Sequence, residues 1–220
     1  MKRIRLSDRR LPNYSKGEEI MNMVTHIVGA ALGILALPLC LLRSDDLTDV
    51  LGSIIYGVCM ITLYTMSSVY HGLRPGMAKK VMQVIDHCTI YLLIAGSYSA
   101  VILCALCKTY PALAWGLLIF EWGLTGIAVT LTAIDLKRYE VFSMICYIGM
   151  GWAVIPFWRQ TLDTLGSAGF WLLLLGGIAY TVGAVLYGLG IKMKWMHSVF
   201  HIFVVLGSVL QFLCIYLYAL

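Results

Sequence analysis

The chain has 220 residues, of which 60% are hydrophobic and only 12% are charged, and its formal net charge is +5. A soluble domain is about half apolar and about a quarter charged, so this composition excludes an ordinary soluble fold and indicates a protein that lies in lipid. The basic residues fall in the N-terminal tail and in short loops, which argues for a role in membrane topology and against nucleic-acid binding.

Seven apolar segments follow a polar, basic stretch of 19 residues, and each segment can cross a bilayer as a helix, which takes roughly 20 residues. We predict a cytoplasmic tail over residues 1–19 and one all-α membrane domain over residues 20–220. Backbone polar groups in lipid must be paired, and continuous apolar runs of this length favour helices over barrel strands. The predicted spans are Ile20–Leu42, Val50–His71, Val81–Leu106, Pro111–Thr132, Val141–Trp158, Leu165–Leu189 and Trp195–Ala219.

The Lys and Arg residues predict the orientation of these spans. The tail and the second, fourth and sixth loops carry thirteen of them, whereas the other side carries three, namely Arg43, Lys108 and Arg159. Cytoplasmic loops carry the basic excess. The N-terminus is therefore expected inside and the C-terminus outside, in a multi-pass protein of the plasma membrane.

This orientation places all five histidines and one acid near the cytoplasmic side: His26, His71, Asp86, His87, His197 and His201. His197 and His201 are one helical turn apart and share a face. Two imidazoles from one helix and a third from another would give three metal ligands and an open position, as in catalytic zinc sites. A nearby carboxylate could hold or deprotonate a water there. The alternative is that each histidine is an ordinary interfacial or hydrogen-bonded residue.

Five stretches match, in order, the sequence pattern of a known family: EEIMNMVTHIVG at 18–29, SSVYH at 67–71, DHCTIYLLIAGSY at 86–98, YTVGAVLY at 180–187 and HSVFHIFVVLG at 197–207. Together they resemble the hemolysin III branch of the progestin and adipoQ receptor (PAQR) family, in a bacterial-type member. The resemblance implies a seven-helix bundle with the N-terminus inside and a zinc ion held by His71, His197 and His201. It assigns Asp86 to a zinc-bound water and Ser67 to the same cluster.

The chain departs from that pattern at three places. Phe200 stands where relatives usually have Trp, and Gln211 stands where many bacterial members have a further His. The stretch at 192–195 lacks the Pro that often precedes the histidine pair, which puts the start of the last helix in doubt. None of these departures removes a ligand.

Several further residues are candidates for a role. Asn22 and His26 share a helix face with Glu18 or Glu19 one turn earlier, and could orient a ligand or a substrate head group; the alternative is an ordinary polar helix entrance. His87 points roughly 100° away from Asp86 on a helix and is left out of the ligand set.

Glu121 lies near the middle of the fourth span, where a carboxylate is costly, and either has a function or makes a structural hydrogen bond. Cys104 and Cys107 are interpreted as small buried hydrophobic residues and not as a redox pair. Two glycine pairs indicate close helix packing: Gly29 with Gly33, and Gly123 with Gly126.

The favoured hypothesis is a membrane zinc hydrolase that cleaves an amide or ester bond of a lipid with a zinc-activated water, with Asp86 and Ser67 as catalytic residues. Distant likeness to membrane ceramidases supports this hypothesis by analogy only. The alternative is a non-enzymatic sensor or receptor, or a regulator of the bilayer, with a structural zinc. A haemolytic or cytolytic activity, as the family name implies, is a third possibility. Expected partners are membrane lipids and a lipid-like substrate or ligand, and no oligomeric state is predicted.

Overall fold

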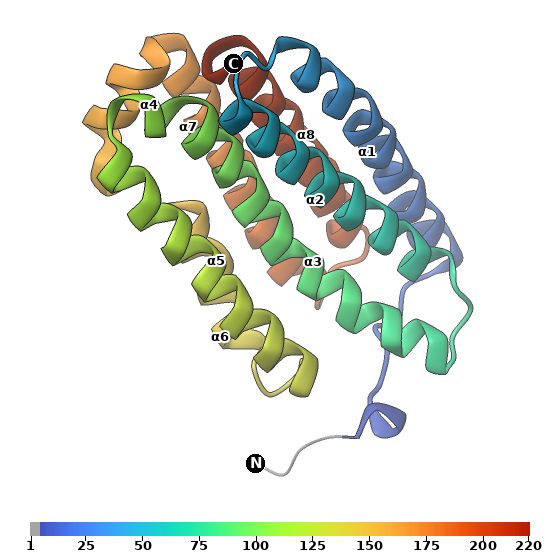
Figure 1. The fold of residues 1–220 in the computed structure, drawn as a ribbon. Helices are drawn as coiled ribbons and strands as arrows, with labels where there is room; N and C mark the ends of the chain where they lie inside the picture. The colour runs from blue at the N-terminus through green and yellow to red at the C-terminus, as the bar shows by residue number, and fades with distance from the viewer. Residues whose placement is uncertain (1–4) are drawn as a thin grey trace.

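The computed structural model describes residues 5–220, and this part of the chain is helical and contains no strand (Figure 1). Six stretches are long and apolar enough to cross a membrane, by length and composition. The elements are η1 (Leu6–Asp8), α1 (Lys16–Arg43), α2 (Leu47–Gly72), α3 (Met77–Val101), η2 (Ile102–Leu106), α4 (Cys107–Thr109), α5 (Pro111–Ile134), α6 (Glu140–Gly151), η3 (Ile155–Phe157), α7 (Trp158–Gly190), α8 (Met196–Cys214) and η4 (Ile215–Ala219).

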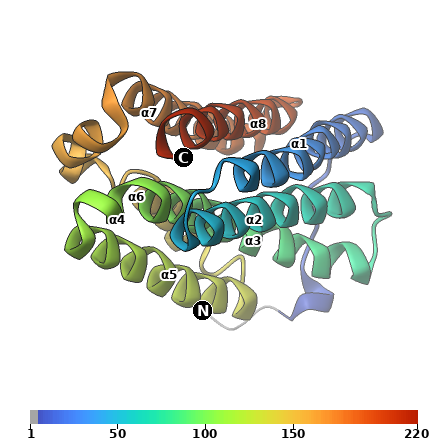
Figure 2. The same cartoon turned by 45° about the horizontal axis from the view of Figure 1, so that its top comes forward.

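The long helices form one bundle in which neighbours in sequence pack against each other: α1 on α2, α2 on α3, α3 on α5, and α7 on α8. α8 also packs against α1, so the last helix lies beside the first (Figure 2). The outer faces carry large apolar side chains, such as Ile119, Val141 and Val185, which are each exposed. An apolar exterior on an apolar bundle is stable only in lipid, and the chain is therefore a multi-pass membrane protein.

The first long helix begins four residues earlier than predicted. Ser15 and Glu18 form a capping box: the Ser15 hydroxyl accepts from the Glu18 N–H, and the Glu18 carboxylate accepts from the Ser15 N–H at 2.9 Å. Hydropathy marks where apolar residues start, whereas the cap marks where the helix starts. The polar residues 16–19 therefore belong to α1, and the side chains of Glu18 and Glu19 make defined contacts.

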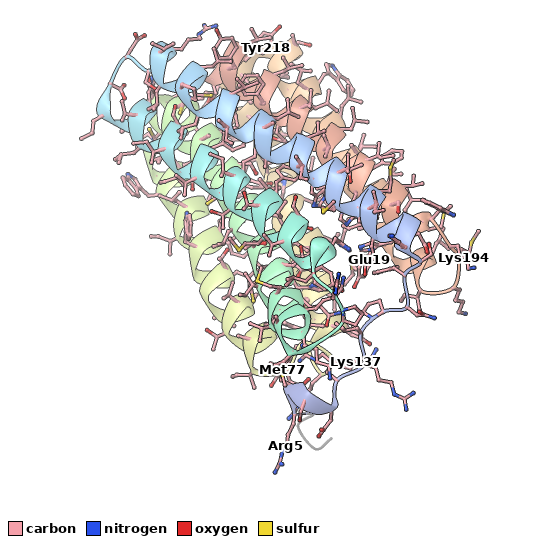
Figure 3. All side chains as sticks on the ribbon, turned by 90° about the vertical axis from the view of Figure 1, so that its right-hand side faces the viewer. Arg5, Glu19, Met77, Lys137, Lys194 and Tyr218 are labelled. Carbon is pink, nitrogen blue, oxygen red and sulfur yellow. The ribbon has the colours of Figure 1, made fainter. Side chains whose placement is uncertain are left out.

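The predicted fifth span appears as a short helix and an irregular turn. α6 has 12 residues, or about 18 Å of helix, which is less than the roughly 30 Å of a hydrocarbon core. After η3, α7 is interrupted at Gly166, whose φ of 67° lies in the left-handed region that glycine tolerates. Lys137 and Lys194 lie toward the end opposite Tyr218, so the segment between them leaves that end and returns to it (Figure 3). The count of seven spans stays a prediction.

Close packing is confirmed for one glycine pair and is wrong for the other. A Cβ on Gly29 would meet the Tyr64 ring at 2.4 Å, and one on Gly33 would meet Ile61 at 3.0 Å. A Cβ on Gly123 or Gly126 would meet nothing within 4 Å among the described residues. Spacing alone does not say which face of a helix meets a neighbour. All seven cysteines are free among residues 5–220; Cys104 is buried, as expected for a small hydrophobic residue, whereas Cys107 is only half-buried.

Candidate metal centre

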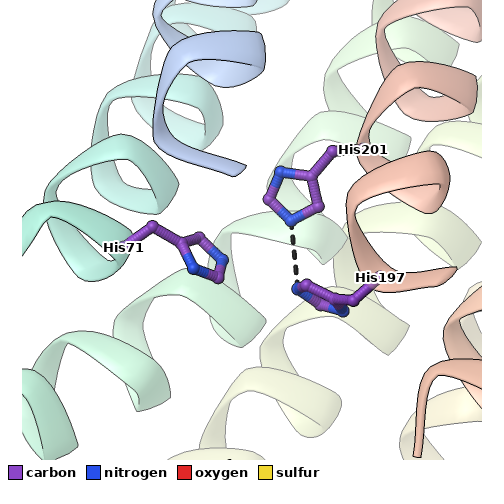
Figure 4. Close-up of side chains that lie close together, drawn as sticks. All are labelled: His71, His197 and His201. Carbon is purple, nitrogen blue, oxygen red and sulfur yellow. Dashed lines mark hydrogen bonds between the residues drawn. The ribbon is translucent and has the colours of Figure 1, made fainter. Parts of the chain in front are cut away.

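Three buried histidines from two helices meet inside the bundle (Figure 4). His71 lies in the last turn of α2, and His197 and His201 lie in the first turns of α8. One ligand nitrogen of each lies within 4.8 Å of the other two, and the Nε2 atoms of His197 and His201 are 3.1 Å apart. The one-turn spacing on α8 puts two rings on one face, and the bundle brings the third ring to them.

The geometry and the unsatisfied atoms of this group fit a metal ion. Two nitrogen ligands at ordinary zinc distances in tetrahedral geometry are about 3.3 Å apart, close to the observed spacing of the two Nε2 atoms on α8. The Nε2 atom of His71 is buried and has no hydrogen-bond partner among the described residues. A buried nitrogen without a partner is costly, and a bound cation would satisfy it. The group His71, His197 and His201 can therefore hold a metal.

Side chains of α1 hold the other nitrogen of His71. Nδ1 lies 2.7 Å from a Glu19 carboxylate oxygen and 3.4 Å from the Asn22 amide nitrogen. The Ser198 hydroxyl donates to the Asn22 amide oxygen at 2.6 Å, which leaves the amide nitrogen facing His71. Asn22 thus contacts both His71 and α8. A metal-binding histidine usually makes such a bond through its second nitrogen, which fixes the ring.

Two rings cover the histidine group from either side. His26 stacks on His201, with ring centroids 3.7 Å apart, and neither of its nitrogens has a hydrogen-bond partner among the described residues. Tyr14, which precedes α1, stacks on His197 with centroids 4.8 Å apart and planes at 21°. Burial raises the pKa of the Tyr14 hydroxyl well above its ordinary value, so this ring is uncharged at neutral pH.

A cavity of about 460 Å³ opens on the same group. Its wall includes His197 and His201, and also Ser67 and Asp86, the two predicted catalytic residues. Asp86 is not one of the residues that could share a metal ion with the three histidines, although it lines the same cavity.

His87 corrects one of our expectations. It lines the same cavity as Asp86, and its Nδ1 is 3.3 Å from the Asp86 carboxylate and 2.8 Å from the Gln83 carbonyl oxygen. The angular argument predicted divergence, but adjacent side chains on a helix can both reach a wide cavity when their rotamers bend toward it. His87 still lies outside the metal-holding group.

The doubtful start of the last helix is resolved by a contact from α1. The Trp195 N–H donates to the Glu18 carboxylate at 2.7 Å, while Trp195 itself is in the left-handed region, with φ of 67°. Glu18 therefore anchors the beginning of α8 directly ahead of His197. The missing proline does not displace the histidine pair, because α8 begins at Met196.

Sequence reasoning missed several side chains around the centre. It did not choose between Glu18 and Glu19, and it gave no role to Tyr14, Lys79 or Tyr187. Lys79 is buried on α3 and forms an ion pair with Glu19. The ring of Tyr187 on α7 lies beside the His197 ring, with centroids 5.6 Å apart. The signals in the sequence were the polar residues at the entrance of an apolar span and, for Tyr187, the family stretch that ends at this residue.

Glu121 is fully buried on α5, and it does not line the cavity. Neither of its carboxylate oxygens has a hydrogen-bond partner among residues 5–220. The structural hydrogen bond that was one of the two expectations is therefore not found in the described part of the chain.

The chain is similar in sequence to known proteins over most of its length. The sequence model described as "Haemolysin-III related" matches residues 14–212. The chain is 36% identical over 206 residues to "Hemolysin-3" of Bacillus cereus, which covers 92% of each chain, and 35% identical over 204 residues to "Hemolysin-3 homolog" of Bacillus subtilis (strain 168), which covers 91% of this chain and 94% of the relative. "Monocyte to macrophage differentiation factor" of Homo sapiens is 24% identical over 211 residues, covering 91% and 84%. As the resemblance of its motifs predicted, the chain belongs to the haemolysin-III-related family, within the hemolysin III branch of the PAQR proteins.

Proposed function

We propose that this protein is a zinc-dependent hydrolase that cleaves an amide or ester bond of a membrane lipid. The observation that carries the proposal is the position of the three histidines. Their ligand atoms converge within 4.8 Å, they are buried, and two of them form part of the wall of an apolar cavity. A metal site that only ties helices together would be closed on all sides, whereas a site beside a cavity leaves room for a substrate.

The side chains in the cavity fit the roles that this reaction needs. When bound, zinc supplies a Lewis acid and lowers the pKa of a coordinated water. Asp86 would accept a proton from a water, and its contact with His87 Nδ1 would hold the carboxylate in position. Ser67, one turn before His71 on the same helix face, would donate a hydrogen bond to the developing oxyanion.

The size and lining of the cavity suit a lipid. Its volume of about 460 Å³ is within the range of small-molecule sites, and its wall is mostly apolar. It extends from Asp86 on α3 to Ile102 in η2, which is about 24 Å of helix and most of the thickness of a hydrocarbon core. A chain lying in this cavity would place its polar head beside the histidines.

We propose seven crossings, with the N-terminus in the cytoplasm and the C-terminus outside. The distribution of thirteen basic residues against three supports this orientation. The segment 138–193 leaves one end of the bundle and returns to it, which takes two crossings. With α6 and η3 as the fifth span, the chain then crosses seven times. The plasma membrane of a bacterium is the proposed location. Reporter fusions after Arg43, Asp135 and Leu220 would test the topology, and a cytoplasmic signal at Leu220 would contradict it.

A sensor or receptor with a structural zinc is the second candidate. It is favoured by the position of the histidines, which join α2 to α8 and so connect the second helix with the last. Ligand binding in the cavity would then change the balance between two helix arrangements. Haemolytic activity, as the names of the two bacterial relatives state, is a third candidate that rests on those names alone.

The deciding experiment combines metal analysis with lipidomics on detergent-purified protein, with wild type beside His71→Ala. We expect about one zinc per chain in the wild type and loss of amide or ester lipids from a membrane extract. The zinc content and the amount of lipid hydrolysed should both be lower in the variant. Zinc without turnover would favour the sensor, and release of haemoglobin from erythrocytes that persists in the variant would favour cytolysis. A wild type without zinc would overturn the hydrolase.

A further inference from the structure

We propose that Glu19 and Lys79 form a buried relay that positions His71 for metal binding, so that both are positioning residues of the centre. The inference rests on the proposed metal site and adds two residues to it. Glu19 contacts His71 through one carboxylate oxygen at 2.7 Å, and it contacts the Lys79 ammonium through the other oxygen, also at 2.7 Å. The three side chains come from α1, α2 and α3.

The contact with Glu19 decides which nitrogen of His71 carries the proton. Nδ1 cannot donate to Glu19 and at the same time accept from Asn22. The carboxylate is at 2.7 Å and the amide nitrogen at 3.4 Å, so the charge-assisted bond to Glu19 is the stronger of the two. With the proton on Nδ1, the lone pair is on Nε2, which is the buried atom without a partner. That tautomer is the one that a metal requires.

Lys79 holds Glu19 in this position. Only 2% of Lys79 is exposed, and a lysine is almost never so deeply buried unless it is paired. Its ammonium also donates to the carbonyl oxygens of Leu73 at 3.1 Å and of His71 at 3.4 Å, and it lies 5.0 Å from the centre of the Tyr70 ring. Lys79 thus holds the Glu19 carboxylate against the C-terminal end of α2, where His71 lies.

The neighbouring lysine on the same helix makes a matched comparison. Lys80 directs its ammonium to the Ser7 carbonyl oxygen in an exposed contact, and it makes no ion pair among the described residues. Removing either lysine removes one positive charge from the same turn of α3. Only the loss of Lys79 would release Glu19.

The test is the affinity for zinc, measured by competition with a chromogenic chelator for wild type, Glu19→Ala, Glu19→Gln, Lys79→Met and Lys80→Met. Loss of an outer partner of a metal-binding histidine costs about 10- to 100-fold in affinity, and we expect a Kd increase of that size for Glu19→Ala. Glu19→Gln keeps an oxygen that accepts from Nδ1–H, so it should recover part of the affinity. Lys79→Met should resemble Glu19→Gln, and Lys80→Met should stay within twofold of the wild type.

A second readout separates positioning from a general loss of stability. In Glu19→Ala loaded with cobalt(II), a displaced His71 should change the shape of the visible ligand-field spectrum. Unfolding of a fraction of the molecules would reduce the intensity of the spectrum and leave its shape unchanged. Zinc affinity and cobalt spectra equal to those of the wild type in Glu19→Ala would overturn the relay and leave the metal site intact. A wild type that binds no zinc would overturn the proposed function and the relay together.

Discussion

Gly29 of α1 lies against the ring of Tyr64 on α2, and Tyr64 also contacts α8 and His26. The substitution Gly29→Ala would put a Cβ 2.4 Å from Cδ1, 2.5 Å from Cε1 and 2.6 Å from Cγ of Tyr64. Ordinary carbon contacts begin near 3.5 Å, so the ring must move by about 1 Å. Tyr64 is completely buried, and its hydroxyl donates to Ser208 Oγ at 2.7 Å, so a shift of that size breaks the bond that joins α2 to α8.

The expected cost follows from these contacts. Overpacking costs about 1–3 kcal/mol and an unsatisfied buried hydroxyl about 1–3 kcal/mol, while the helix propensity of alanine returns about 1 kcal/mol. The net destabilisation is about 1–5 kcal/mol, or roughly 2–20 °C in Tm for a chain of this size. Tyr64 also meets His26 edge-on at 4.9 Å, and His26 stacks on His201, so zinc affinity should fall as well.

The assay is thermal unfolding in one detergent, with and without zinc, for wild type, Gly29→Ala and Gly126→Ala. A Cβ on Gly126 meets nothing within 4 Å among the described residues, so this control should raise Tm by at most about 2–4 °C, which corresponds to about 1 kcal/mol of helix propensity. A Tm for Gly29→Ala equal to or above that of Gly126→Ala would refute the reasoning, because it would mean that the Tyr64 ring can move without loss.

Three further predictions concern the metal centre directly. His197→Ala should reduce zinc to well below one per chain, whereas His87→Ala, outside the metal-holding group, should keep it; undiminished zinc in the first variant, measured by elemental analysis, would remove His197 from the site. Asp86→Asn should keep zinc and abolish lipid hydrolysis, because the amide cannot accept a proton; full turnover in that variant would exclude Asp86 as the base. Tyr14→Ala should speed the transfer of zinc to a chelator by several-fold, because it uncovers His197, and Tyr110→Ala, whose hydroxyl donates to Asp163 outside the site, should leave the transfer rate unchanged.

The sequence predicted that the histidines gather at one end of the bundle, and the family motifs singled out the three that meet. The spacing of His197 and His201 places them on one helix face, and the distribution of basic loop residues places His71 at the same end. Both arguments use properties of the chain that do not depend on side-chain packing. The family motifs added Ser67 and Asp86, and the structure places both of them in the wall of the same cavity as the histidines.

Other features could not be predicted, because they depend on which helices become neighbours. Glu18 and Glu19 are adjacent in sequence and about 100° apart on α1, and one contacts the start of α8 while the other contacts His71. Hydropathy could not reveal that α6 ends at Gly151, because the apolar run continues across the turn. The same limit explains the wrong prediction of close packing at Gly126: no neighbouring helix approaches that face.

The distance in sequence between the histidines has a consequence for how the protein is made. His71 and the first of its partners on α8 are separated by 125 residues, and α8 is the last helix of the chain. During synthesis from the N-terminus, α1 and α2 are complete while the other two ligands have not yet been translated. Chains that stop before Met196 contain Glu19, Lys79 and one of the three histidines, and they cannot assemble the centre. In the proposed site, a metal ion can therefore bind all three ligands only after α8 has been made and has packed into the bundle.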